Sequence, residues 1–260
     1  MRTRELGIII GTLPPGAHNA ITDVPGVRVG STTLIDERRS PPIHTGVTVI
    51  LPHEGNIWTE PLFAGCHRLN GNGEMTGLEW IRESGMLTSP IALTNTHSVG
   101  VVRDALVADA IARHQPDDLF WALPVVAETY DGLLNDINGL HVKPEHVLQA
   151  LESAADGPVS EGNVGGGTGM ICHGLKGGTG TASRVTAAAA GGYTVGVLVQ
   201  ANHGRRERLQ IDGVHVGKAI PHSIIPTPSV PVSSQHGGGS IIVIVATDAP
   251  LIPTQCIRLA

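Results

Sequence analysis

Short apolar runs, each bounded by turn residues, constrain the fold of this chain more than any other feature. Five of them are rich in β-branched residues and have the length of one strand: 46–52, 90–96, 120–129, 193–202 and 240–248. Several are almost continuously apolar, which predicts strands covered on both faces. Patterns typical of helices lie among them, at 76–85, 98–115, 143–154 and 183–192. This alternation of strands and helices predicts an α/β fold built from stacked layers.

Residues at the ends of the predicted helices indicate where they begin. Thr76 and Ser98 are candidate N-caps of the first two, and Pro144 fits the first turn of the third. A further short helix is expected around Pro253, so the sequence is predicted to stop inside an element. Residues 221–239 contain four prolines and three glycines, which predict an extended arm leading to Ser240.

Composition and charge argue against several classes of protein. Hydrophobic residues make up 41% of the 260 residues, charged residues only 15%, and the net charge is −6, so nothing indicates a nucleic-acid partner. No apolar run is long enough to cross a membrane, and the short N-terminal run ends at Pro14, unlike a signal peptide. We therefore expect no membrane partner and a cytoplasmic location. The thin surface charge suits a homo-oligomer with covered faces.

Cysteine and histidine positions match no familiar disulfide or metal motif. Cys66, Cys172 and Cys256 are odd in number, far apart and without a CxxC pair. The 13 histidines include no HExxH motif and no tight cluster of ligands in the sequence. We expect no metal site, and we interpret Cys172 as a small buried residue.

Ser240 stands out because three glycines precede it and an apolar strand follows, in the segment HGGGSIIVIVATDAP. A serine hydroxyl is a poor nucleophile without a base, and no GxSxG elbow surrounds this one. If the Gly239–Ser240 bond were cut, Ser240 would gain an α-amine with a pKa of ~7.7–8.0, suited to a general base near neutral pH. The spacing alone also fits a simpler interpretation, a flexible loop before a strand.

Ser240 could make this cut itself. Its hydroxyl would attack the Gly239 carbonyl, the acyl group would shift from nitrogen to oxygen, and water would hydrolyse the resulting ester. Glycine before the serine favours this reaction because it has no Cβ to hinder the attack and tolerates unusual backbone angles.

Other polar and glycine-rich positions are weaker candidates. Tyr130 and Asn202 each lie at the end of a predicted strand, where they could donate hydrogen bonds to a developing oxyanion, although their neighbours are also typical of plain turns. The glycine-dense segments 161–170 and 176–184 match neither GxxxxGK[ST] nor a Rossmann motif. We interpret these segments as loops whose glycines let the backbone pack closely near a site.

Nine segments spread in order along the chain form a recognisable set: RELGIIIGTLPPGAHNAITDVPGVRVG, TGVTVILPH, NGNGEMTGLEWI, LTNTHSVG, VVAETYDGLLNDI, EGNVGGGTGM, KGGTGTASR, VGVLVQANHG and GGGSIIVIVATDAPL. This set resembles the L-aminopeptidase/D-esterases and β-peptidyl aminopeptidases, a DmpA-like family of self-processing N-terminal-serine hydrolases. The resemblance implies a four-layer αββα sandwich like that of the ornithine acetyltransferases. It also implies one peptidase domain over 1–260, cut into an α segment, 1–239, and the start of a β segment, 240–260.

The same resemblance assigns roles to individual residues. Ser240 is the expected nucleophile, and Tyr130 and Asn202 are the expected oxyanion donors. Asn163 and Gly166 are expected in the substrate pocket, and neither a cofactor nor a metal is implied. Members of this family continue beyond DAPL with a Ser-Gly-Glu/Asp segment, so we expect a C-terminally truncated chain.

The sequence thus predicts an aminopeptidase or amidase that hydrolyses N-terminal residues of short peptides, amides or esters through a serine acyl-enzyme. The alternatives are an acyltransferase that passes the same acyl group to an amine, and an inactive homologue that acts as a scaffold.

Overall fold

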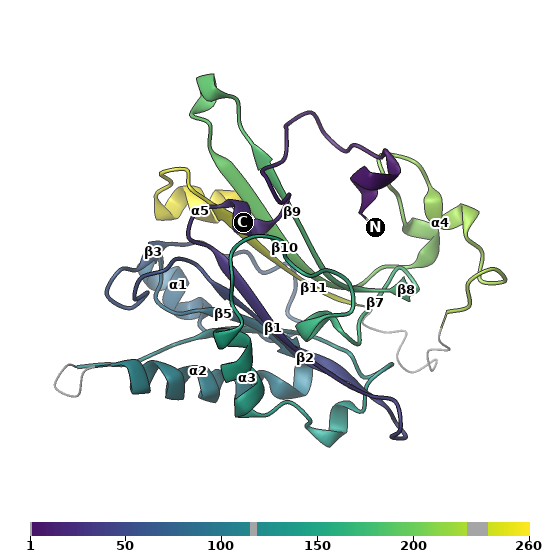
Figure 1. The fold of residues 1–260 in the computed structure, drawn as a ribbon, viewed down its shortest axis with the longest axis horizontal. Coiled ribbons are helices and arrows are strands. Elements are labelled where there is room, and N and C mark those ends of the chain that lie inside the picture. The colour runs from purple at the N-terminus through teal and green to yellow at the C-terminus, as the bar shows by residue number, and fades with distance from the viewer. Residues whose placement is uncertain (1, 115–118, 228–238) are drawn as a thin grey trace.

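Two β-sheets form the centre of the computed structural model, which describes residues 2–114, 119–227 and 239–260 (Figure 1). The first sheet contains, in order, β1 (Arg28–Asp36), β2 (Ile43–Leu51), β5 (Ile91–Asn95) and β6 (Val125–Thr129). Strands β5 and β6 are parallel, whereas the other neighbours are antiparallel. The second sheet has the antiparallel order β11 (Ser240–Thr247), β10 (Thr194–Asn202) and β9 (Gly178–Val185). Two ribbons pair β3 (Leu62–Phe63) with β4 (Met86–Leu87) and β7 (Ile171–Cys172) with β8 (Leu175–Lys176).

Two helices cover the face of the first sheet that points away from the second sheet (Figure 1). They are α2 (Val99–Arg113) and α3 (Pro144–Glu152). The other α-helices are α1 (Leu78–Ser84), α4 (Val216–Ala219) and α5 (Pro253–Leu259). Short 3₁₀ helices span Thr3–Leu6, Ile21–Asp23, Thr96–Ser98, Ile137–Gly139, Gly165–Gly167, Ala188–Ala190 and Arg206–Arg208. The described residues therefore supply a helical layer followed by two sheets.

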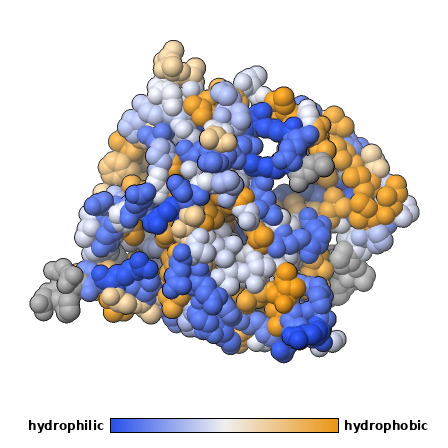
Figure 2. Space-filling model, in the orientation of Figure 1, coloured by the Kyte–Doolittle hydropathy of each residue, from blue (hydrophilic) through white to orange (hydrophobic). Residues whose placement is uncertain are grey.

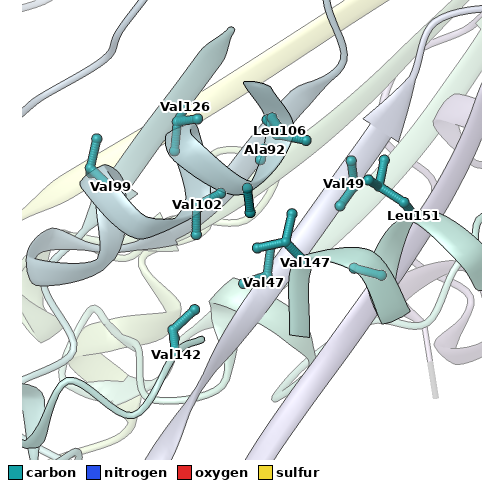
Figure 3. Packing of buried hydrophobic residues seen from close by; sticks show 12 residues of the cluster. Val47, Val49, Ala92, Val99, Val102, Leu106, Val126, Val142, Val147 and Leu151 are labelled. Atoms are coloured by element: carbon teal, nitrogen blue, oxygen red, sulfur yellow. The ribbon is translucent and has the colours of Figure 1, made fainter. Parts of the chain in front are cut away.

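Alternation along β2 explains why its sequence is apolar at nearly every position. Val47 and Val49 belong to the core under α2 and α3, and Figure 3 shows Val47 near Val147 and Val49 near Leu151. Ile50 belongs instead to the core between the two sheets, together with Leu198 of β10. Neighbouring side chains of a strand point to opposite faces, so β2 is buried on both sides, as its apolar run predicts.

Two of the places where apolar side chains are exposed lie on the second sheet and near α4. On the outer face of the second sheet, Val243 and Val245 of β11 are 50% and 37% exposed. Near α4, the exposed residues include Val214, Ile224 and Ile225, and Figure 2 shows a broad hydrophobic area on that side of the molecule. The second sheet is thus less completely covered than the first.

Most of the elements predicted from sequence are confirmed, with one clear error. The segment 183–192 is not a helix, because Ser183–Val185 complete β9 by pairing with Thr194–Gly196 of β10. The alanines that follow form one 3₁₀ turn, and Gly191 and Gly192 end it with positive φ angles. Sheet pairing therefore overrides the helical preference of this stretch.

Smaller differences concern the ends of elements. The strand predicted at 120–129 begins only at Val125. The Thr76 hydroxyl does not cap α1 but donates a hydrogen bond to the Pro124 carbonyl at 2.7 Å, and the Ser98 side chain makes no capping bond to α2. Pro144 and Pro253 do occupy the first turns of α3 and α5. Within the predicted arm at 221–239, residues 228–238 lie outside the described residues.

Candidate active site around Ser240

Ser240 is the first residue of β11, and its hydroxyl receives hydrogen bonds from both sheets. The Tyr130 backbone N–H donates to Ser240 Oγ at 3.2 Å, and Asn202 Nδ2 donates to the same atom at 3.3 Å. Tyr130 follows β6 of the first sheet, whereas Asn202 is the last residue of β10 and pairs with Ser240 across the second. The ends of three strands thus meet at one hydroxyl. The structure brings together the three residues that the sequence singled out.

Tyr130 reaches this hydroxyl with its backbone and not with its phenol. Its phenol oxygen lies over Gly132, where an added Cβ would come within 2.5 Å of it, and the Tyr130 residue is 47% exposed. In this conformation the group at Tyr130 that donates to Ser240 is therefore the peptide N–H, and its expected role toward an oxyanion stays a prediction. A peptide N–H is an effective donor in such sites because its position is fixed by the fold.

Asn202 is held in the orientation that lets it donate. Its Oδ1 accepts a hydrogen bond from the Ile171 backbone N–H at 2.9 Å, which directs Nδ2 toward Ser240. An aspartate at this position could accept from Ile171 but would have no proton to offer the serine. The chemistry of the site therefore favours an amide side chain.

Gly239 connects Ser240 to the preceding arm in a conformation that other residues rarely adopt. Its φ angle is +93°, and an added Cβ would lie 2.7 Å from the His203 Cα. A positive φ and close backbone contact both favour glycine. Only glycine at this position lets the peptide bond before Ser240 lie against His203 without displacing it.

A buried glutamine links the two sheets beneath Tyr130. Gln200 of β10 has no exposed surface, and its Nε2 donates to the Thr129 hydroxyl at 2.8 Å and to the Thr94 carbonyl at 3.0 Å. Thr129 is the last residue of β6 and immediately precedes Tyr130. This bridge fixes the end of β6, and therefore the direction of the Tyr130 N–H, relative to β10.

Asp131 adds a buried carboxyl on the other side of Tyr130. It has no exposed surface and accepts a hydrogen bond from Asn135 Nδ2 at 3.0 Å. Burial raises the pKa of this carboxyl, and polar contacts with Thr45, Asn135 and Asn95 oppose the rise in part. Tyr130 therefore lies between two completely buried polar residues, Thr129 and Asp131.

The two residues expected in the substrate pocket do not contact Ser240. Gly166 is buried between the sheets, where its N–H donates to Thr48 Oγ1 at 3.2 Å and an added Cβ would collide with Gln200. Asn163 is exposed, and its side-chain amide donates to the Thr168 and Gly177 carbonyls, each at 3.3 Å. A surface hollow beside this segment is lined by residues such as Val164 and Thr179, and Ser240 is not among them. The pocket assignment stays a prediction.

A second group of reactive side chains lies close to Ser240 and was not expected from the sequence. Cys172, His173 and His203 place one metal-binding atom each within 4.8 Å of one another; we call them the Cys–His–His cluster. Burial raises the pKa of the Cys172 thiol, while burial and nearby His173 lower the pKa of His203. At neutral pH both groups are therefore uncharged. Cys172, which we predicted to be a small buried residue, is only half-buried.

Comparison with known proteins identifies the family. A family model described as "Peptidase family S58" matches residues 19–260. The chain belongs to this peptidase family. Beta-peptidyl aminopeptidase BapA of Sphingosinicella microcystinivorans is 51% identical over 271 residues, which cover 100% of this chain and 67% of that protein.

Solved structures show the same likeness in three dimensions. A Burkholderia sp. beta-aminopeptidase matches with a TM-score of 0.93 and 60% identity, covering 100% of this chain and 70% of that one. The L-aminopeptidase D-Ala-esterase/amidase of Ochrobactrum anthropi matches with a TM-score of 0.87 and 48% identity, again covering 100% and 70%. The latter is described as a prototype for the serine aminopeptidases and a new variant among the Ntn hydrolase fold.

These findings confirm the predicted family and the α/β sandwich, and they place the S58 chain among aminopeptidases, a class of hydrolases. The chain spans 67% of the length of the curated relative. Among the residues that the structure describes, no helix is both long and apolar enough to span a bilayer.

Proposed function

We propose that this S58 chain is a self-processing serine aminopeptidase that acts on the N-terminal residues of short peptides, amides or esters. The observation that carries the proposal is the environment of Ser240, whose hydroxyl follows a positive-φ glycine and accepts hydrogen bonds from Tyr130 and Asn202. The names of the relatives, which include β-peptidyl aminopeptidase, L-aminopeptidase and D-Ala-esterase/amidase, support this range of substrates.

Processing would begin with attack of Ser240 Oγ on the Gly239 carbonyl carbon. The C–N bond breaks, the nitrogen takes up the serine proton, and an ester joins Gly239 to Oγ. Water then hydrolyses the ester, which leaves a carboxylate on Gly239 and a free α-amine on Ser240. This α-amine has a pKa of ~7.7–8.0 in an ordinary environment and therefore supplies the base that the uncut chain lacks.

Turnover would use the same atoms on a bound substrate. The Ser240 amine accepts the hydroxyl proton while Oγ attacks the substrate carbonyl, and the Tyr130 N–H and Asn202 Nδ2 stabilise the negative oxygen that forms. The amine then gives the proton to the leaving nitrogen or oxygen. Water, activated by the same amine, releases the acyl group and restores the serine hydroxyl.

Mass spectrometry combined with an activity assay tests this proposal. The wild-type protein is expected to separate under denaturing conditions into residues 1–239 and a piece that begins SIIVIV, and to hydrolyse aminoacyl p-nitroanilides. Ser240→Ala removes the nucleophile and should stay uncut and inactive. Ser160→Ala changes an exposed serine of a different segment and should behave as wild type.

Two results would contradict the proposal. One is hydrolysis by protein in which residues 239 and 240 are still joined, because the amide nitrogen cannot act as the base. The other is wild-type protein that stays both uncut and inactive after prolonged incubation, which would favour a scaffold.

A further inference from the structure

The Cys–His–His cluster has the composition of a transition-metal site. Cys172 ends β7, His173 follows it directly, and His203 lies just after β10, so a short ribbon and a strand end bring the three together. All three residues are partly exposed, which leaves solvent access for an incoming ion. One thiolate and two imidazoles suit zinc and related cations, whereas magnesium and calcium prefer oxygen ligands.

The backbone already holds the cluster in place. The His173 N–H donates to the His203 carbonyl at 2.7 Å, and the centroids of the two imidazole rings are 5.2 Å apart. Gly204 makes room for the ring of His173, because an added Cβ there would lie 2.5 Å from His173 Nδ1. A small residue after His203 thus allows the two histidines to approach.

One histidine is also held in a tautomer that leaves one ring nitrogen free to bind a metal. His173 Nδ1 lies 3.0 Å from the Arg205 carbonyl oxygen. A carbonyl oxygen can only accept, so Nδ1 carries the proton and Nε2 keeps its lone pair. Metal-binding histidines commonly make such a bond with their second ring nitrogen, which orients the ring.

We propose that Cys172, His173 and His203 bind a divalent cation of the zinc class, with water as the fourth ligand. Zn–S and Zn–N bonds of about 2.3 and 2.0–2.1 Å place tetrahedral donor atoms roughly 3.3–3.6 Å apart. The three donor atoms now lie within 4.8 Å of one another. Rotation of the partly exposed side chains would shorten these separations to the tetrahedral range. As the Sγ–metal bond forms, the Cys172 thiol loses its proton to solvent.

Metal binding would also act on Ser240, a consequence that rests on the proposed function. His203 directly follows Asn202, whose Nδ2 donates to Ser240 Oγ, and Gly239 lies against the His203 backbone. An ion that fixes His203 would restrain the neighbouring Asn202 amide, which the processed protein is proposed to use as a donor. We expect saturating zinc to lower the peptidase activity of the processed protein.

Cobalt spectroscopy tests the binding site without relying on activity. Co²⁺ added to the purified, reduced protein should produce tetrahedral visible bands and a thiolate charge-transfer band, and Zn²⁺ should abolish both. Cys172→Ser should lose the charge-transfer band, and His173→Ala and His203→Ala should weaken Co²⁺ binding at least about tenfold. Cys256→Ser and His67→Ala alter a cysteine and a histidine outside the cluster and should leave the spectrum unchanged.

The result that would overturn the site is a wild-type protein without a thiolate band, or a band that Cys172→Ser retains. Circular dichroism of each variant separates loss of a ligand from loss of the fold. His173→Ala should in addition retain peptidase activity in zinc concentrations that inhibit wild type. Equal inhibition of wild type and His173→Ala by zinc would show that the metal does not act on Ser240. Whether the cluster binds a metal would still be decided by the cobalt spectra.

Discussion

Tyr130 and Asn202 donate to the same hydroxyl, but they are supported in different ways. Tyr130 follows β6, a strand buried at all five positions, and it offers a backbone N–H. Asn202 ends β10 in a half-buried region and offers a side-chain amide. The first donor is therefore positioned by the core of the protein, whereas the second depends on one hydrogen bond from Ile171.

Because of this difference, a substitution can remove the donor at Asn202 but not the donor at Tyr130. A side-chain donor disappears with its side chain, so the Asn202 side is vulnerable to a single change. A backbone donor survives any substitution that preserves the strand end, so the Tyr130 side is vulnerable only through the buried groups around it. These are Gln200, Thr129 and Asp131.

The largest effect is expected at Asn202. Asn202→Ala removes the Nδ2 donor and should lower kcat by ~10²–10³, measured as aminoacyl p-nitroanilide hydrolysis per mole of processed enzyme. Tyr130→Phe retains the backbone N–H and should change kcat only a few-fold. A Tyr130→Phe variant as defective as Asn202→Ala would show instead that the phenol turns toward the substrate and serves as the donor.

A smaller effect, on stability, is expected at the buried bridge under Tyr130. Gln200→Ala leaves a cavity and removes the hydrogen bonds to Thr129 and Thr94, which should lower the free energy of unfolding by about 3 kcal/mol. Urea denaturation measures this change. Gln149→Ala, on the exposed side of α3, should cost less than about 0.5 kcal/mol. Equal stabilities for the two variants would mean that the bridge does not hold the sheets together.

The smallest effect is expected from the charge state of Asp131. Because burial raises its folded-state pKa, the protonated form favours folding. Relative to Asp131→Asn, wild type should thus be most stable below the unfolded pKa of about 3.9. It should lose this advantage as the pH rises through the folded pKa. Urea denaturation across this pH range measures the difference in unfolding free energy.

Asp156→Asn supplies the control for that titration, because Asp156 is exposed. Its unfolding free energy should follow the wild-type curve across the same pH range. If the unfolding free energy of Asp131→Asn also followed the wild-type curve at every pH, protonation of the buried Asp131 carboxyl would not stabilise the fold as predicted.

The sequence predicted strands best where both faces are apolar. The runs that became β2, β5, β10 and β11 were recognisable because hydrophobic burial determines them locally. Strand β9 was missed because its residues are mainly glycine, threonine and serine, and its extended form depends on pairing with β10. Such a strand has no periodic signal of its own, since its partner lies elsewhere in the chain.

The site shows the same limit. Ser240, Tyr130 and Asn202 were identified through an ordered family resemblance, and their meeting at one hydroxyl agrees with it. The use of the Tyr130 backbone could not be predicted, because backbone direction depends on how β6 ends. The Cys–His–His cluster was equally hidden, since His203 is far from the other two residues in sequence and only the fold unites them.

The position of Ser240 at the head of β11 has a consequence for the protein after a cut. Eight residues from Ser240 to Thr247 are aligned with Asn202 to Val195 in one antiparallel ladder, and Ile242 and Ile244 pack into the interior. After a cut before Ser240, β11 would remain hydrogen-bonded to β10 as part of the second sheet. The new N-terminus at Ser240 would thus already lie beside Asn202 and Tyr130 without any rearrangement of the fold.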